Sequence, residues 1–332
     1  MLLLVRAAIC GLAASPRGTL PRMNAAAAPA VEILQFLPML PPLSPGTVAS
    51  AALRIENGEL SAPVWMPDEE AVAFMDRGQH VLMDRSRNLE LLPAATDGAM
   101  CAHALLGGSM LAACGGAARL LRGVVVEPRS VASLPFEGAS ELSGISTLCP
   151  LSDARLLVGT DDGRLLCLSE ASPPVTLLSG FPAGSLRDAC VSTDEKSLYV
   201  LCGDASVARC AFDVDAGTCS SPVALPQLAE SLGASSVVSS IACDVSGNLY
   251  VGATEGVLLV DETGDAMIRL PTPAPATGLC FGGTSMSELF VSAGDTIWRV
   301  QTSTQGVQPP SPEFLKYMEK LAAAGDYRHV GW

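Results

Sequence analysis

The sequence predicts an all-β fold, a six-bladed β-propeller with a short C-terminal helix. A unit recurs along the chain, formed by an apolar strand, a turn rich in Asp, Ser and Gly, and a second apolar strand. Successive units are 39 to 51 residues apart when their second strands are aligned on Val72, Leu111, Leu157, Leu198, Leu249 and Leu289. Periods of roughly 40 to 50 residues that hold several short strands are typical of propeller blades.

Residues 1–45 are predicted to be a leader and linker outside the propeller. The first fifteen residues are apolar apart from Arg6, and no acidic residue precedes Glu32. This composition fits a secretory signal or an organellar transit peptide, and its Ala and Arg content favours the latter. A start at Met23 and a cytoplasmic protein is the alternative. The proline-rich stretch 38–45 is expected to be extended, and the whole segment to be removable.

Residues 46–304 are predicted to form the propeller. Turn residues at 160–163 and 245–248 lie between apolar runs, where a hairpin needs positive φ. Third strands are expected at 164–168, 256–260 and 296–300, and their continuous apolar character suits sheets that pack face to face. An open ring would expose an unpaired edge, so residues 48–55 are expected to complete the last blade.

Two further segments need an interpretation. Residues 99–118 carry no charge, but paired glycines interrupt them at strand-like intervals. We therefore expect two buried strands and no membrane span. Residues 305–332 are expected to form a tail with a helix, in which Ser311 caps, Pro312 begins and Gly325 ends the helix. The helix would pack on the propeller or dock a partner.

Composition excludes several classes of protein. A formal net charge of -14 and a pI near 4.6 indicate an acidic, soluble protein and argue against nucleic-acid partners. The 49% of hydrophobic residues argues against disorder of the main body. The 11 cysteines form no C-x-x-C pair and only three histidines are present, which argues against a zinc site. The cysteines are either buried thiols of a reducing compartment or include one or two disulfides, with Cys202–Cys210 the first pair to test.

Several motifs resemble those of the senescence marker protein, gluconolactonase and luciferin-regenerating enzyme family, a regucalcin-like family. Residues 241–260, the F-G-G motif at 281–283 and the strand at 288–291 resemble the last two blades of that family. The P-V-W of residues 63–65 is similar to its first-blade motif, and residues 192–200 are similar to its S-P-D-G-x-x-L-Y-V motif. The resemblance spans about residues 58 to 300, and F-G-G is its most specific part. A strictosidine-synthase-like or paraoxonase-like propeller would lack the F-G-G match.

The resemblance implies hydrolysis of sugar lactones or related carboxylic esters with a divalent cation held by a Glu, an Asn and an Asp. Calcium prefers such oxygen ligands, and the cation polarises a carbonyl and activates water. The three ligand positions and one substrate-contacting position fall on Ser61, Arg187, Ser239 and Ser146, respectively. The family calcium site is therefore expected to be lost, with no cofactor. A one-residue slip would bring Asp188 to the second position, Glu59 lies two residues before the first, and Asp244 matches a later, structural Asp.

Two functional hypotheses follow. The chain is a lactonase or esterase-type hydrolase with a substituted site, or a non-catalytic propeller, a pseudoenzyme, that binds a small anion or assembles with a protein partner at the mouth of its channel. If the alignment of the motifs holds, Arg187 would take the place of the cation, with Asp188 as its counter-charge. The alternative is that Arg187 pairs with an acidic residue at the rim.

Overall fold

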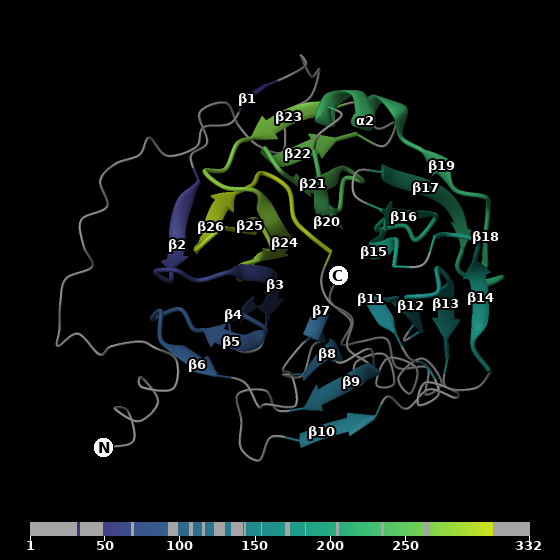
Figure 1. The fold of residues 1–332 in the computed structure, drawn as a ribbon, viewed down its shortest axis with the longest axis horizontal. Coiled ribbons are helices and arrows are strands. Elements are labelled where there is room, and N and C mark those ends of the chain that lie inside the picture. Colours follow the sequence, from purple (N-terminus) through teal and green to yellow (C-terminus); the bar gives the residue numbers. More distant parts are fainter. Residues whose placement is uncertain are drawn as a thin grey trace, which may run out of the picture.

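The computed structural model describes residues 32–33 and 49–307, apart from loop positions of which the longest runs are 92–98, 123–129 and 134–141. Side chains are described outside 91–141 and 262–267. The strands form antiparallel sheets arranged in a ring, each sheet running outward from the centre (Figure 1). The sheets are numbered 1 to 6 in the order in which their first strands occur after residue 60.

The first three sheets take their strands in sequence. Sheet 1 contains β3 (Leu60–Met66), β4 (Ala71–Asp76), β5 (Gln79–Met83) and β6 (Leu89–Leu91). Sheet 2 contains β7 (Ala99–Leu105), β8 (Ser109–Cys114), β9 (Ala117–Arg122) and β10 (Ser130–Ser133). Sheet 3 contains β11 (Ile145–Pro150), β12 (Leu156–Thr160), β13 (Leu165–Leu168) and β14 (Val175–Leu178).

The other three sheets have additional or borrowed strands. Sheet 4 contains β15 (Leu186–Val191), β16 (Ser197–Cys202) and β17 (Ser206–Asp213), whose outer edge pairs with both β18 (Thr218–Cys219) and β19 (Val223–Ala224). Sheet 5 contains β20 (Val238–Cys243), β21 (Leu249–Ala253), β22 (Gly256–Val260), β23 (Ala266–Leu270) and β1 (Glu32–Ile33). Sheet 6 contains β24 (Ala276–Gly282), β25 (Glu288–Ala293), β26 (Thr296–Gln301) and β2 (Ser50–Arg54).

The predicted fold of a six-bladed β-propeller with a short C-terminal helix is wrong in this form. Five blades are described with their side-chain packing, and the sheet of β7–β10 is described by its backbone alone. Sheets 4 and 5 have five strands each. The helix within the described residues, α2 (Pro226–Leu232), lies between sheets 4 and 5, and the helix expected at 311–325 lies outside them. The longest step of the repeat, from Leu198 to Leu249, accommodates the extra strand and α2.

Burial explains why these segments become strands. The aligned anchors lie in the second strand of their sheets, and Leu157, Leu198, Leu249 and Leu289 are fully buried. Every residue of β12, β13, β21 and β22 is buried, because neighbouring sheets cover both faces. The core therefore lies in layers between consecutive sheets, and the expected third strands are confirmed as β13, β22 and β26.

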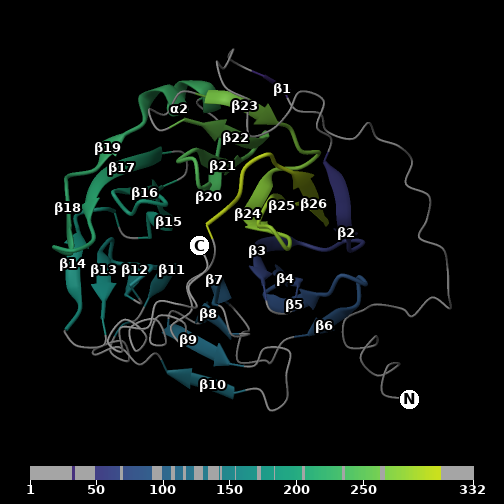
Figure 2. The same ribbon diagram turned by 180° about the vertical axis from the view of Figure 1, so that it is seen from behind.

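The ring closes between the two ends of the described chain. β2 pairs antiparallel with β26, with Ser50 opposite Arg299, so the expectation for residues 48–55 is confirmed. Figure 2 shows β2 on the outer side of the sheet that β24–β26 complete. The predicted leader lies outside the described residues except for Glu32–Ile33, which pair with β23. Residues 99–118 form strands as expected, but they contain β7, β8 and the start of β9 rather than two strands, and their burial is not described. In the described part of the chain, no helix has the length and apolar character to span a membrane.

The two most specific family-like motifs meet where sheets 6 and 1 join. Trp65 of P-V-W stacks on Phe290, with ring centroids 5.7 Å apart. Gly282 of F-G-G lies under the same indole, and a Cβ at this position would be 2.7 Å from Trp65 Cγ. These motifs are therefore explained by packing at the closure of the ring.

Candidate functional site

The innermost strand of each sheet carries a β-bulge near its start. Figure 1 shows β3, β7, β11, β15, β20 and β24 as the strands nearest the centre. The register of each shifts by one residue against the second strand, and the bulged residues of β7, β11, β15, β20 and β24 are Met100, Ser146, Arg187, Ser239 and Thr277. In β3 the shift falls between Ser61 and Val64, and Ala62 has a φ of 45°. Bulges re-aim side chains and are frequent beside functional sites.

Three of the four sequence-predicted site residues thus occupy equivalent bulge positions, and the fourth, Ser61, directly precedes the bulge of its strand. We call this set of bulges the bulge ring. Thr277 belongs to the same ring and was missed by the sequence reasoning. The spacing along the sequence could have identified Thr277. In sheets 3 to 6 the bulged residue lies ten to twelve residues before the repeat anchor of the second strand.

Hydrogen bonds between neighbouring sheets show that the bulges lie at one level. The Asp188 carboxylate accepts from the Thr147 hydroxyl of sheet 3 at 3.5 Å and from the backbone N–H of Ile241 in sheet 5 at 2.9 Å. The Ser239 hydroxyl donates to the carbonyl of Ala276 in sheet 6 at 2.6 Å. The Thr277 hydroxyl donates to the carbonyl of Leu60 in sheet 1 at 2.6 Å. A belt of polar contacts therefore joins sheets 3, 4, 5, 6 and 1.

The predicted site residues differ in what they offer a ligand. Ser239 has a single hydroxyl proton, which points to the carbonyls of Ala276 and, at 3.2 Å, Gly252. Ser146 is buried, and its Oγ has no hydrogen-bond partner among the described residues. Ser61 is half-buried, whereas Arg187 is exposed. Arg187 is therefore the most accessible of the four.

Asp188 is the titratable group of the belt. Desolvation between sheets 4 and 5 raises its pKa to about 6, against the opposing effect of hydrogen bonds from the backbone of Ile241 and Ala189 and from Thr147. In β15 the bulged residue is Arg187, while Asp188 lies opposite Leu201. Glu59 precedes β3, where it is exposed. Neither carboxylate takes the bulge position itself.

The oxygen donors of the bulge ring do not match the set that calcium prefers. Calcium takes six to eight oxygens, including several carboxylates. In the described parts of the chain, no group of three or more His, Cys, Asp or Glu side chains could hold a metal ion. Asp188 already accepts two backbone N–H groups, and Arg187 supplies donors alone.

Asp244 holds a turn. It is fully buried, and its Oδ1 accepts the backbone N–H of Ser246 at 2.8 Å and of Asn248 at 2.9 Å. Its Oδ2 accepts the Asn248 side chain at 2.8 Å. These bonds close the hairpin between β20 and β21, so Asp244 is a structural residue.

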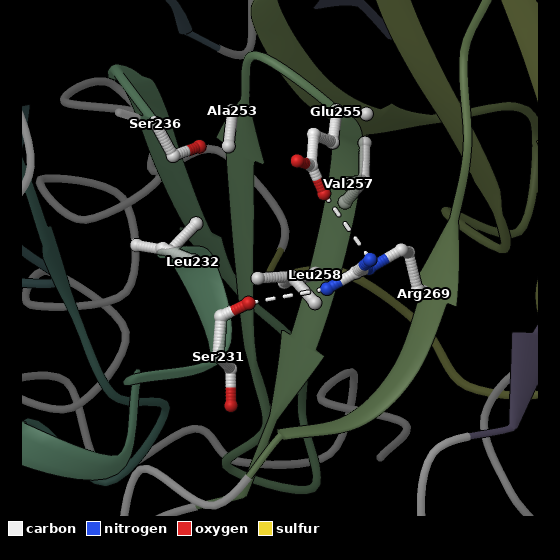
Figure 3. Close-up of a pocket in the computed structure, with 9 residues that line it drawn as sticks. Ser231, Leu232, Ser236, Ala253, Glu255, Val257, Leu258 and Arg269 are labelled. Atoms are coloured by element: carbon white, nitrogen blue, oxygen red, sulfur yellow. Dashed lines mark hydrogen bonds and ion pairs between the residues drawn. The ribbon is translucent and has the colours of Figure 1, made fainter. Parts of the chain in front are cut away.

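A small pocket beside α2 is separate from the bulge ring (Figure 3). Arg269 of β23 pairs with Glu255 at 3.1 Å and donates to the carbonyl of Ser231 in α2 at 3.1 Å. The guanidinium thereby ties the helix to sheet 5. Two buried atoms at the pocket, Arg269 Nε and Ser236 Oγ, have no hydrogen-bond partner among the described residues. We interpret the pocket as part of the attachment of α2.

The ring of antiparallel sheets with bulged innermost strands defines a β-propeller. Residues 188–295 match the family model described as the SMP-30/Gluconolactonase/LRE-like region. The chain thus carries a gluconolactonase-like propeller region, and the resemblance seen in its motifs is confirmed. The match includes Asp188, Ser239 and Thr277 and begins directly after Arg187.

Solved structures with the same fold include a gluconolactonase from Xanthomonas campestris, with a TM-score of 0.69, 15% identity, and coverage of 83% of this chain and 97% of that one. A luciferin-regenerating enzyme has a TM-score of 0.66 at 15% identity, covering 80% and 99% of the two chains. Regucalcin from Agrobacterium tumefaciens, a calcium-binding protein, has a TM-score of 0.64 at 15% identity, covering 80% and 97%. At these identities the likeness concerns the fold. No curated protein sequence matches the chain.

Proposed function

We propose that this protein is a gluconolactonase-like propeller that binds a lactone or its hydroxy-acid form at the bulge ring, without calcium and with Arg187 as the anchor. The observation that carries the proposal is an exposed arginine at the bulge position of an innermost strand. A guanidinium binds a carboxylate through two parallel charge-assisted hydrogen bonds, a geometry that an amine or a hydroxyl does not offer.

We also propose that the family's calcium ligands are substituted here. Two of the equivalent positions carry hydroxyls, and the Ser239 proton is donated to backbone carbonyls. A permanent positive charge at the third position would repel a cation unless several carboxylates surrounded both. Asp188 is the carboxylate adjacent to Arg187, and its oxygens accept backbone N–H groups of β15 and β20.

Hydrolysis is the second candidate function, and the raised pKa of Asp188 supports it. A carboxyl whose pKa is raised to about 6 lies in the range of an effective general base near neutral pH. Asp188 would take a proton from water as the water attacks the lactone carbonyl. Arg187 would stabilise the oxyanion that develops, and the ring oxygen would leave with a proton returned from Asp188.

The test is calorimetric titration of gluconate into the protein in the presence of a chelator. The proposal expects binding that the chelator does not change, and a loss of at least about tenfold in Arg187→Gln. Arg164→Gln is the matched control, because Arg164 is an exposed arginine that pairs with Asp162 on a turn. Equal affinity in both variants, or binding that requires added calcium, would contradict the proposal.

Hydrolysis is tested separately with glucono-1,5-lactone and the same chelator. Turnover above the spontaneous rate that falls at least about a hundredfold in Asp188→Asn would support general-base catalysis. Binding without turnover would leave the protein as a binding propeller.

A further inference from the structure

Two cysteine thiols meet at the interface between sheets 4 and 5. Cys190 belongs to β15 and Cys243 to β20, and their Sγ atoms lie 3.2 Å apart. Both strands are innermost strands of their sheets (Figure 1). The contact joins parts of the chain separated by 53 residues.

Cys202 and Cys210, the first disulfide candidate from the sequence, do not face each other as Cys190 and Cys243 do. Cys202 lies opposite Ser206 and Cys210 opposite Leu198 in the ladder of β16 and β17. The Cys202 thiol points to the carbonyl of Val200 at 3.9 Å. The sequence could not identify the Cys190–Cys243 contact, because it depends on how two sheets face each other.

The register of the two strands supports the contact independently. Asp188 and Ile241 are joined by a hydrogen bond of 2.9 Å between the same two strands. Cys190 and Cys243 each lie two residues further along. Since side chains alternate with a period of two, Asp188 and Cys190 point to the same side of β15, toward sheet 5. The Asp188–Ile241 hydrogen bond therefore holds β15 and β20 in the arrangement in which the two thiols meet.

We propose that Cys190 and Cys243 are an oxidation site, at which a small-molecule disulfide converts the two thiols into a cross-link between sheets 4 and 5. One protein thiolate attacks a sulfur of the oxidant and displaces one thiolate, giving a mixed disulfide. The second protein thiolate then attacks the protein sulfur of that mixed disulfide and displaces the other thiolate. The two protons of the protein thiols pass to the two leaving thiolates, and the oxidant takes up two electrons. The Sγ atoms need to approach from 3.2 Å to about 2 Å.

Burial sets the rate of this reaction. Desolvation raises the pKa of the Cys190 thiol well above its ordinary value, and the neighbouring Cys243 adds to the effect. The thiolate is the reactive form, so oxidation of the folded protein is slow at neutral pH and accelerates as the pH rises. Cys149 is a competing third thiol, because it lies close enough to Asp188 and Cys243 for both to raise its pKa beyond the effect of burial.

The cross-link would connect the strands that carry Arg187 and Ser239 close to the bulge ring. It would also restrict the unfolded chain by closing a loop between residues 53 positions apart. We therefore expect the oxidised protein to melt at a temperature higher by roughly 5 °C or more than the reduced protein.

The experiment treats the folded full-length chain with oxidised glutathione at pH 8, blocks the remaining thiols and digests the protein with a glutamate-specific protease. Cleavage after Glu170 and Glu195 and after Glu230 and Glu255 gives peptides 171–195 and 231–255, each with a single cysteine, Cys190 or Cys243. The proposal expects a disulfide-linked pair of these two peptides by mass spectrometry, absent after reduction.

Cys190→Ala and Cys243→Ala are each expected to lose the linked peptides and the rise in melting temperature, whereas Cys202→Ala keeps both. If either alanine variant fails to fold, the linkage and the reversible shift measured in the unmodified chain decide the matter. A linkage of 171–195 to the peptide that contains Cys149, no linkage at all, or a linked protein without a higher melting temperature would overturn the proposal.

Discussion

Arg187 and Asp188 are sequence neighbours that a single bulge sends to different surroundings. Arg187 is the bulged residue of β15, whereas Asp188 lies opposite Leu201. Arg187 is exposed, while the Asp188 carboxylate lies between sheets 4 and 5 and accepts the N–H of Ile241. The resemblance of the motifs placed one position of the candidate site on Arg187, with Asp188 one residue away. The bulge itself was not predicted, because a bulge depends on pairing with the neighbouring strand.

The pH dependence of folding tests the environment of Asp188. Its pKa is raised to about 6 in the folded protein from 3.8, so the folded state binds more protons than the unfolded state between these values. The associated stability is complete below about pH 4 and is lost as the pH rises through 6. The Asp188→Asn variant lacks this titrating carboxyl group. We expect the free energy of unfolding of the unmodified protein, minus that of the variant, to fall by up to about 3 kcal/mol between pH 4 and pH 7.

Urea unfolding of both proteins at several pH values measures this difference. Asp84, Asp162, Asp194 and Asp295 have lowered pKa values through their hydrogen bonds and contribute the opposite slope, but they are common to both proteins and cancel. A difference that is flat or that rises with pH would show that Asp188 is not desolvated.

At the scale of elements, the strands were predictable and the connections were not. Continuous apolar runs flanked by turn residues predicted β12, β16, β21 and β22, because burial on both faces requires such runs. The helix α2 was missed although Pro226 begins it and Leu228 and Leu232 lie four residues apart on its buried side. At seven residues it is too short for a periodicity to be recognised. The fifth strands of sheets 4 and 5 were missed because two-residue strands have no pattern.

Two truncations test the role of β2. Removing residues 1–45 is expected to change the melting temperature by a few degrees at most, because its described part is the two-residue β1 at an outer edge. Removing residues 1–55 also deletes β2 and leaves β26 without its partner, so that sheet 6 has an open edge. We expect this truncation to lower the melting temperature by roughly 10 °C or more or to prevent folding. Equal melting temperatures in a calorimetric scan of both truncations would contradict closure by β2.

At the scale of the whole molecule, the ring is held by contacts that join the first and last sheets. Trp65 packs on Phe290 and over Gly282, and the Thr277 hydroxyl reaches the Leu60 carbonyl. The P-V-W and F-G-G motifs lie at this junction, which explains why they predict the fold better than the site. The number and uniformity of the blades were overestimated, since evenly spaced anchors do not show how many strands each sheet acquires.

Gly282→Ala tests this junction. The added Cβ would lie 2.7 Å from Trp65 Cγ and 2.9 Å from the ring of Phe290, so the indole has to move. Overpacking of this kind costs about 1 to 3 kcal/mol of unfolding free energy. Combining Gly282→Ala with Trp65→Leu provides the control, because the smaller side chain removes the clash and the two effects then are not additive. Full additivity in urea unfolding would show that Gly282 and Trp65 do not interact.

We propose that the bulge ring of this gluconolactonase-like propeller functions without calcium, with Arg187 where the family's cation is expected. Calorimetric titration of the chelator-treated protein with calcium tests this proposal. We predict no binding below millimolar concentration, and none created by Arg187→Asn alone, because the remaining positions still offer hydroxyls and one carboxylate held by backbone N–H groups. Micromolar binding of calcium by the unmodified protein would contradict the claim.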